Sequence, residues 1–183
     1  MDPAALLRPG LLDGVVVALG GGGETFDAPL TMLGARTAAL PATPDEEAMA
    51  AAVDPATRVL LHDLRPAFAD GLRATLDLAW ITVRAVANAA YIPDASGGKI
   101  VLIAPAADHT GDPALAGVRA AAENLARTLS IEWARHGIAT VAIAPGAGAA
   151  EDELAALAAY LASPAGDYYS GTRLDLGASA RAT

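Results

Sequence analysis

Two short stretches of the sequence combine residue types that can exchange protons or bind a metal ion. His62 is followed by Asp63, and Asp108 is followed by His109. An imidazole beside a carboxylate can serve in acid–base catalysis, and both groups are common metal ligands. Adjacent residues of a strand point to opposite faces, however, and no third ligand lies at a useful spacing. We therefore interpret these residues as polar groups at strand ends or on the surface, and we expect no metal site.

A run of four glycines is the other candidate for chemistry: Gly20, Gly21, Gly22 and Gly23. It follows an uncharged segment rich in β-branched residues, at residues 15–19. Successive backbone N–H groups in such a run can form a nest for an anion. The other interpretation is a turn without a ligand, and the sequence leaves both open.

Composition excludes several classes of protein. The chain has 183 residues, 12 basic and 21 acidic side chains, a net charge of -9 and no cysteine. A hydrophobic fraction of 54% excludes a disordered chain, and the absence of cysteine excludes disulfides and thiolate sites. The chain has only one lysine, and its arginines are scattered along the sequence. We therefore expect binding to neither nucleic acid nor membrane. No signal peptide and no membrane-spanning run are visible, which predicts a cytoplasmic protein.

Short apolar segments alternate with helical patterns along the chain. The predicted strands are residues 15–19, 37–40, 59–61, 100–103, 139–143 and 172–176. The predicted helices are residues 68–90, 114–135 and 151–162, with an exposed helix beginning near Asp45. Trp80 and Trp133 lie on helical apolar stripes, which indicates packing in a core or an interface. Continuous apolar strands separated by helices predict one doubly wound, Rossmann-like α/β domain over residues 1–183.

The second half of the chain resembles the short-chain dehydrogenase/reductase family. Residues 97–103 (GGKIVLI) are similar to its central strand, and residues 123–138 are similar to the helix that follows. Ala144-Pro145-Gly146 resembles its strand-end Pro-Gly, and residues 161–177 resemble its closing helix and last strand. The resemblance covers most of the chain and is weaker before Phe68.

The resemblance places the catalytic residues of the family on positions that have changed. The catalytic Tyr falls on Leu115 and the Lys, four residues later, on Arg119. The Ser falls on Ala104 or Pro105, and the Asn falls near Thr75. Leucine has no exchangeable proton, and losing a general acid of this kind costs about 10² to 10⁴ in rate. The resemblance therefore implies the fold without the catalytic machinery.

The cofactor-binding loop of the family is changed as well. Gly20 matches the first glycine of its Thr-Gly-x-x-x-Gly-x-Gly motif, whereas the other two fall on Glu24 and Phe26. A carboxylate repels a pyrophosphate, and a phenyl ring occupies space where backbones should approach each other. His62 to Arg65 stand where the family has Asn-Asn-Ala-Gly. We accordingly expect no cofactor and regard the glycines as a vestigial loop.

The family's substrate-covering segment is missing, whereas the parts that form its subunit interfaces are retained. After Pro145-Gly146 the chain passes through four small residues into the last helix, so the domain is shortened. The helices at 68–90 and 114–135 match those that form a four-helix dimer interface in the family.

These features lead to a main hypothesis and two alternatives. The first is a catalytically silent, dehydrogenase-like subunit that assembles with itself or with an active paralogue. The second is an NAD(P)-dependent oxidoreductase that uses unfamiliar residues, such as Asp108 or His109, as the proton donor. The third is a binding module that holds a small molecule in the emptied cleft.

Overall fold

Six short segments form one parallel sheet. The computed structural model describes residues 7–93, 95–108 and 111–177. The strands are β1 (Val16–Gly20), β2 (Arg36–Ala39), β3 (Val59–Asp63), β4 (Gly98–Ile103), β5 (Ile138–Pro145) and β6 (Thr172–Leu176). Their order in the sheet is β2-β1-β3-β4-β5-β6, and every neighbouring pair is parallel. All six predicted strands are confirmed, and their ends differ from the predicted ones by at most two residues.

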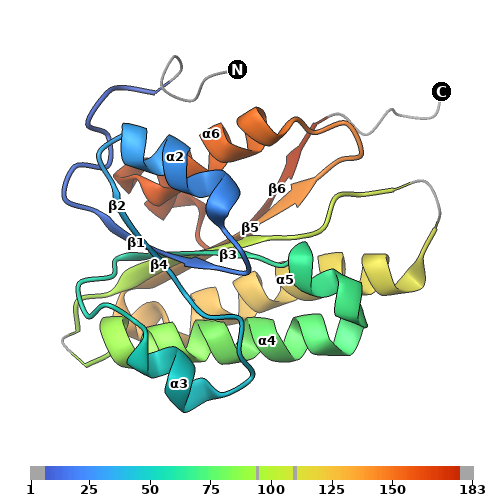
Figure 1. The fold of residues 1–183 in the computed structure, drawn as a ribbon, viewed down its shortest axis with the longest axis horizontal. Coiled ribbons are helices and arrows are strands. Elements are labelled where there is room, and N and C mark those ends of the chain that lie inside the picture. The colour runs from blue at the N-terminus through green and yellow to red at the C-terminus, as the bar shows by residue number, and fades with distance from the viewer. Residues whose placement is uncertain (1–6, 94, 109–110, 178–183) are drawn as a thin grey trace.

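Helices cover both faces of this sheet (Figure 1). One face is covered by α2 (Glu24–Met32) and α6 (Glu151–Ala162), which also pack against each other. The opposite face is covered by α3 (Glu46–Ala51), α4 (Gly71–Val86) and α5 (Pro113–Glu132). The predicted doubly wound, Rossmann-like sheet is therefore correct.

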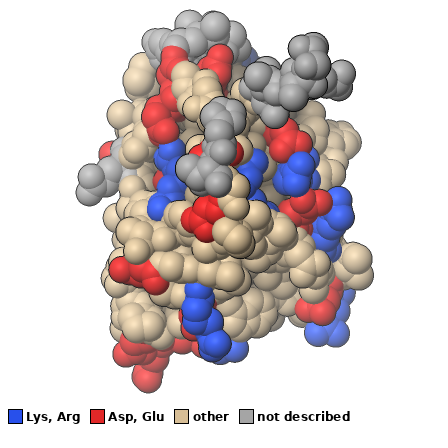
Figure 2. All heavy atoms as spheres, turned by 90° about the vertical axis from the view of Figure 1, so that its right-hand side faces the viewer, with Lys and Arg blue, Asp and Glu red and all other residues tan. Residues whose placement is uncertain are grey.

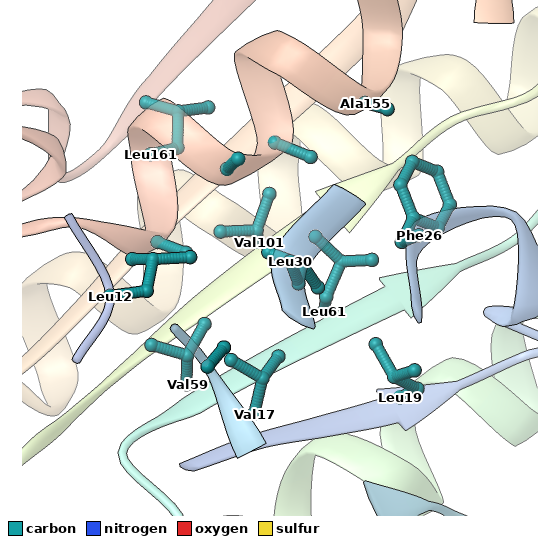
Figure 3. Packing of buried hydrophobic residues seen from close by; sticks show 14 of the residues in the cluster. Leu12, Val17, Leu19, Phe26, Leu30, Val59, Leu61, Val101, Ala155 and Leu161 are labelled. Carbon is teal, nitrogen blue, oxygen red and sulfur yellow. The ribbon is translucent and has the colours of Figure 1, made fainter. Parts of the chain in front are cut away.

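Side chains along each central strand alternate between two apolar cores. Val17, Leu61 and Val101 belong to the core under α2 and α6, where Phe26 and Leu30 reach them from α2 (Figure 3). The intervening residues Ala18, Leu60, Ile100, Leu102 and Ala142 belong to the core under α3, α4 and α5. Because both sets are buried, the strands read as continuous apolar runs in the sequence.

The helix predicted at residues 68–90 is three successive pieces in the structure. A 3₁₀ turn at Pro66–Asp70 precedes α4, and a π-helical turn at Ala87–Tyr91 follows it. Gly71 has a φ of 91°, a value that glycine adopts without strain, and it separates the first turn from the helix. The last turn buries Tyr91, whose hydroxyl donates to the Lys99 carbonyl oxygen at 3.1 Å.

Sequence patterning does not predict α2. The helix contains Pro29, and no side chain caps its start at Gly23. Only Phe26, Leu30 and the flanking Leu33 bury apolar side chains fully, so the periodic signal is short. Packing against the sheet and α6, rather than local propensity, stabilises this helix.

Acidic and basic side chains are interspersed on the face of the molecule to which the loop after β4 projects. In Figure 2, blue and red groups lie next to each other and no continuous basic area is seen. Within the described part of the chain, no helix has the length and apolar character needed to cross a bilayer.

Truncating Phe26 tests whether tertiary packing holds α2 in place. The side chain is 0% exposed. Phe26→Ala should lower the free energy of unfolding by about 3–5 kcal/mol, because it removes buried apolar area and leaves a cavity. Urea denaturation measures this change, with the exposed Thr25→Ala as the control. A loss below about 1 kcal/mol would show that α2 packs loosely on the sheet.

Candidate functional site

The two neighbours of β1 in the sheet create a crevice at its carboxyl end. The chain runs from β1 to β2 on one side and later places β3 on the other side. Ligands of open α/β sheets bind outside the carboxyl ends of the strands at such a switch point. Here the segments that meet are the glycine turn after β1 and residues 62–65 at the end of β3.

The glycine turn packs directly against the end of β3. A Cβ atom on Gly20 would lie 2.5 Å from His62 Nδ1, and one on Gly21 would lie 1.8 Å from the Asp63 carbonyl oxygen. Gly21 and Gly22 also have φ values of 74° and 81°. Close approach and backbone conformation therefore account for these glycines without any ligand.

Arg65 is the most extensively paired side chain of the crevice. Its Nε lies 2.9 and 3.0 Å from the two carboxylate oxygens of Asp63, and its Nη2 lies 2.8 Å from Oδ2. Its Nη1 donates to Glu151, the first residue of α6, at 2.5 Å. Burial alone would lower the pKa of Arg65, but the two carboxylates more than offset this and raise it. One guanidinium thus joins the end of β3 to α6.

These residues do not fit the pyrophosphate of a dinucleotide. Phe26 stands where the resemblance requires a glycine, and its ring lies 5.7 Å below the Arg65 guanidinium. That guanidinium is already paired with two carboxylates, so it is not free to bind phosphate. The structure does not describe the side chain of Glu24, the other replaced glycine.

His62 is a buried histidine without a hydrogen-bond partner. It is 1% exposed, and neither ring nitrogen forms a hydrogen bond within the described residues. Burial lowers the pKa of His62 to about 4, although the Gly20 backbone partly opposes this. The prediction of a strand-end position is confirmed, but a surface position is wrong for both His62 and Asp63 because β3 is central in the sheet.

The positions that match the catalytic residues of the family hold side chains with packing roles. Leu115 is buried on the first turns of α5, 7% exposed. Thr75 is buried on α4, and its hydroxyl donates to the carbonyl oxygens of Ala67 and Gly71 at 3.0 and 2.8 Å. Pro105 follows β4 and is buried. Leu115 and Pro105 have no exchangeable side-chain proton, and the hydroxyl proton of Thr75 is directed to backbone carbonyl oxygens.

Arg119 lies at the Lys position and joins the carboxyl ends of two strands. Its Nη1 donates to the carbonyl oxygens of Pro105 at 2.5 Å and Pro145 at 2.7 Å. Burial lowers the pKa of Arg119, and the like charge of Arg173 acts in the same direction. The guanidinium therefore keeps the positive charge expected at this position, but it hydrogen-bonds to backbone and links the ends of β4 and β5.

No other residue of the described chain supplies the missing pair. Lys99, the only lysine in the sequence, lies at the opposite end of β4. It donates to the Ser163 carbonyl oxygen at 2.5 Å and pairs with Asp167 at 2.7 Å. His109, the proton donor of the alternative hypothesis, lies outside the described residues, and the described residues contain no group of three potential metal ligands.

The link between Arg65 and Glu151 was not predicted from the sequence. These residues are 86 positions apart, and no local pattern joins them. One feature of the sequence could have indicated this contact. Only a short segment separates Pro145 from Glu151, so the start of α6 must lie near the carboxyl end of the sheet. The three acidic residues at that start also suit the positive end of the helix dipole, so their presence alone indicates no distant partner.

Comparison with known proteins identifies the fold. No family model and no curated protein sequence matches the chain. A solved citronellol catabolism dehydrogenase of Pseudomonas aeruginosa PAO1 matches with a TM-score of 0.75 and 23% identity, over 93% of this chain and 96% of that one. A short-chain dehydrogenase of Mycobacterium smegmatis matches with a TM-score of 0.74 and 21% identity, over 93% and 94%.

A third solved structure carries a cofactor. The Bacillus cereus enoyl-acyl carrier protein reductase, solved with NADP⁺ and indole naphthyridinone, matches with a TM-score of 0.71 and 14% identity. The match covers 91% of this chain and 96% of that one. The chain therefore has the fold of the short-chain dehydrogenases/reductases, as the resemblance implied.

Burial of His62 predicts a specific dependence of stability on pH. The unfolded chain binds a proton on this residue near pH 6.5, whereas the folded chain does so only near pH 4. Stability should therefore fall as the pH drops through this window, by up to about 3 kcal/mol from His62 alone. Urea denaturation of His62→Leu at several pH values should show a flatter profile than the wild type. Equal profiles would contradict a neutral, buried imidazole.

Replacing Arg65 should lower the stability of the fold more than replacing its partner Glu151. Arg65→Met leaves Asp63 as a buried, unpaired carboxylate and should cost about 3–5 kcal/mol of stability. Glu151→Gln removes the more exposed partner and should cost less than about 1 kcal/mol. Chemical denaturation of both variants tests the ranking, and the reverse order would show that the Asp63 pair is not the main one.

Proposed function

We propose that this protein is a catalytically silent subunit with the dehydrogenase/reductase fold, which assembles through α4 and α5 with a copy of itself or with an active relative. The observation that carries the proposal is the burial of Leu115 where the resemblance requires a proton donor. A rate loss of about 10² to 10⁴ follows from such a change alone.

The remaining catalytic positions support the same conclusion. Thr75 and Arg119 direct their polar groups to backbone carbonyl oxygens, so they have become parts of the scaffold. Tyr91, the described tyrosine nearest to the Tyr position in sequence, donates to the Lys99 carbonyl oxygen and is fully buried. A phenol held in this way cannot reach a substrate.

The assembly surface would lie along α4 and α5. Trp80 on α4 is 40% exposed and stacks on Trp133, with the ring centroids 6.4 Å apart. Beside it, a hollow of about 300 Å³ between the two helices is lined by Leu76, Ala121 and Leu125, among others. Large apolar side chains around a hollow are typical of protein–protein anchors, and a tryptophan of a partner helix would fit there.

Charged pairs border this surface and would set the orientation of the partner. Arg84 packs on the Trp80 ring at 5.5 Å and pairs with Glu46 from α3. On α5, Glu123 pairs with Arg127 and with Arg173 from β6. An apolar centre with a polar rim is the usual anatomy of a specific interface.

Trp80→Glu should disrupt this assembly. A charge at the centre of an apolar interface is costly, so the variant should shift from oligomer to monomer at micromolar concentration. Native mass spectrometry measures the change, and circular dichroism checks that the fold is retained. Met32→Glu is the control, because Met32 is a 58% exposed apolar residue on α2, across the sheet from the proposed surface.

A pull-down from the native host distinguishes the two kinds of assembly. A stoichiometric dehydrogenase that carries Tyr and Lys would identify a hetero-oligomer and its reaction, whereas recovery of the protein alone would indicate a homo-oligomer. A wild-type chain that is monomeric and captures no dehydrogenase would contradict the proposal.

Cofactor titration tests the alternative of an NAD(P)-dependent oxidoreductase. Solved neighbours of this fold include NADP complexes, and this is what favours the alternative. Under our proposal, NADH and NADPH up to millimolar concentration should cause no saturable change in tryptophan fluorescence. Saturable binding followed by turnover would favour the oxidoreductase.

A further inference from the structure

A hollow of the described chain lies beside the glycine turn, away from the proposed assembly surface. Its volume is about 630 Å³, within the range of small-molecule sites. It lies between Gly21 and Gly22, the segment after β2 that includes Pro44, and the start of α4. We call it the glycine-turn hollow.

The walls of the glycine-turn hollow are apolar and rigid. Pro44 and Pro66 form parts of two walls, and Ala74 and Leu78 project from α4. Proline and alanine lose almost no side-chain entropy when a ligand packs against them. Such walls favour a flat, apolar ligand body.

The charged residues that line the hollow are acidic. They are Asp70 and Asp77, and no Lys, Arg or His belongs to its described lining. A second hollow of about 480 Å³ adjoins it through Gly22 and Ala42, and among the described side chains Asp27 is the one charged residue of its lining. Arg73 pairs with Asp77 at 2.7 Å but extends into solvent, with its side chain 90% exposed.

Asp70 is the carboxylate best placed to receive a ligand. It precedes α4 but caps none of the backbone N–H groups of that helix. By contrast, Asp27 accepts a hydrogen bond from Thr37, and Asp77 is paired with Arg73. A positive group in the hollow would therefore find its strongest attraction at Asp70.

We propose that the glycine-turn hollow binds a small organic cation with a flat apolar body, such as an aromatic amine. The apolar walls hold the ring, and Asp70 holds the ammonium group. Phosphate and carboxylate ligands of the same size are repelled by the same carboxylate. The site binds without turnover, and it is independent of the assembly surface because Ala74, Asp77 and Leu78 lie on a different side of α4 from Trp80 and Leu76.

A pair of probes with the same body and opposite charge tests this site. Tryptamine and 3-indolepropionate share an indole ring and a two-carbon chain, and they end in an ammonium and a carboxylate. Isothermal titration calorimetry should show saturable binding of tryptamine at submillimolar to millimolar concentration. Binding of 3-indolepropionate should be at least about tenfold weaker, since the Asp70 carboxylate repels it.

Three variants locate the binding. Asp70→Asn should weaken tryptamine binding about fivefold, because it removes one close charge without removing a helix cap. Ala74→Phe should abolish binding by filling the hollow, with circular dichroism and thermal unfolding as checks of the fold. Glu132→Gln is the control, since it makes the same change in net charge at an exposed position at the far end of α5.

Any of the following three results would overturn the proposal. Equal binding of the two probes would show an apolar hollow without charge selection, and binding of neither would show that the hollow is not a site. An equal loss in Glu132→Gln and Asp70→Asn would indicate a general charge effect. Trp80→Glu should bind tryptamine as the wild type does, so failure of the assembly proposal can be distinguished from failure of this one.

Discussion

The pairing of Arg65 with Asp63 is the constraint on which the crevice depends. Asp63 ends a central strand and is almost fully buried, so its charge requires a close partner. Arg65 is this partner, with three side-chain contacts of 2.8–3.0 Å, and its Nη1 also donates to Glu151 on α6. Phe26 packs beneath the same guanidinium. One residue therefore connects β3, α2 and α6 at the point where a relative of this fold would open to a ligand.

The residues at the positions that match the family's catalytic ones form internal contacts. Arg119 joins the ends of β4 and β5, and Thr75 joins α4 to the turn before it. His62 is a buried imidazole that packs against the glycine turn. These contacts join elements at the carboxyl edge of the sheet, while the hollow next to the glycine turn stays open with carboxylates on its walls.

Much of this fold was predictable because the four inner strands, β1, β3, β4 and β5, are buried on both faces. Continuous apolar runs identified these four strands, and apolar periodicity identified α4, α5 and α6. The helix α2 was not predicted, since Phe26 and Leu30 are anchored by residues far away in the sequence. The start of α3 was predicted from Asp45, whose carboxylate accepts from the N–H groups of Glu47 and Ala48. Local signals were enough wherever the stabilising partners were local.

The sequence by itself determined which side chains stand at the positions that the resemblance assigns to catalysis, because side-chain identity alone decides whether a proton donor exists there. Leucine at position 115 and arginine at 119 needed no coordinates. Only the tertiary structure decided what the remaining groups do. In the fold, His62 and Asp63 are buried and Arg65 pairs with Glu151 of α6. Trp80 is exposed beside one hollow, and Asp70 and Asp77 line another. Burial and pairing are properties of the folded neighbourhood, since they depend on residues brought together from distant parts of the chain.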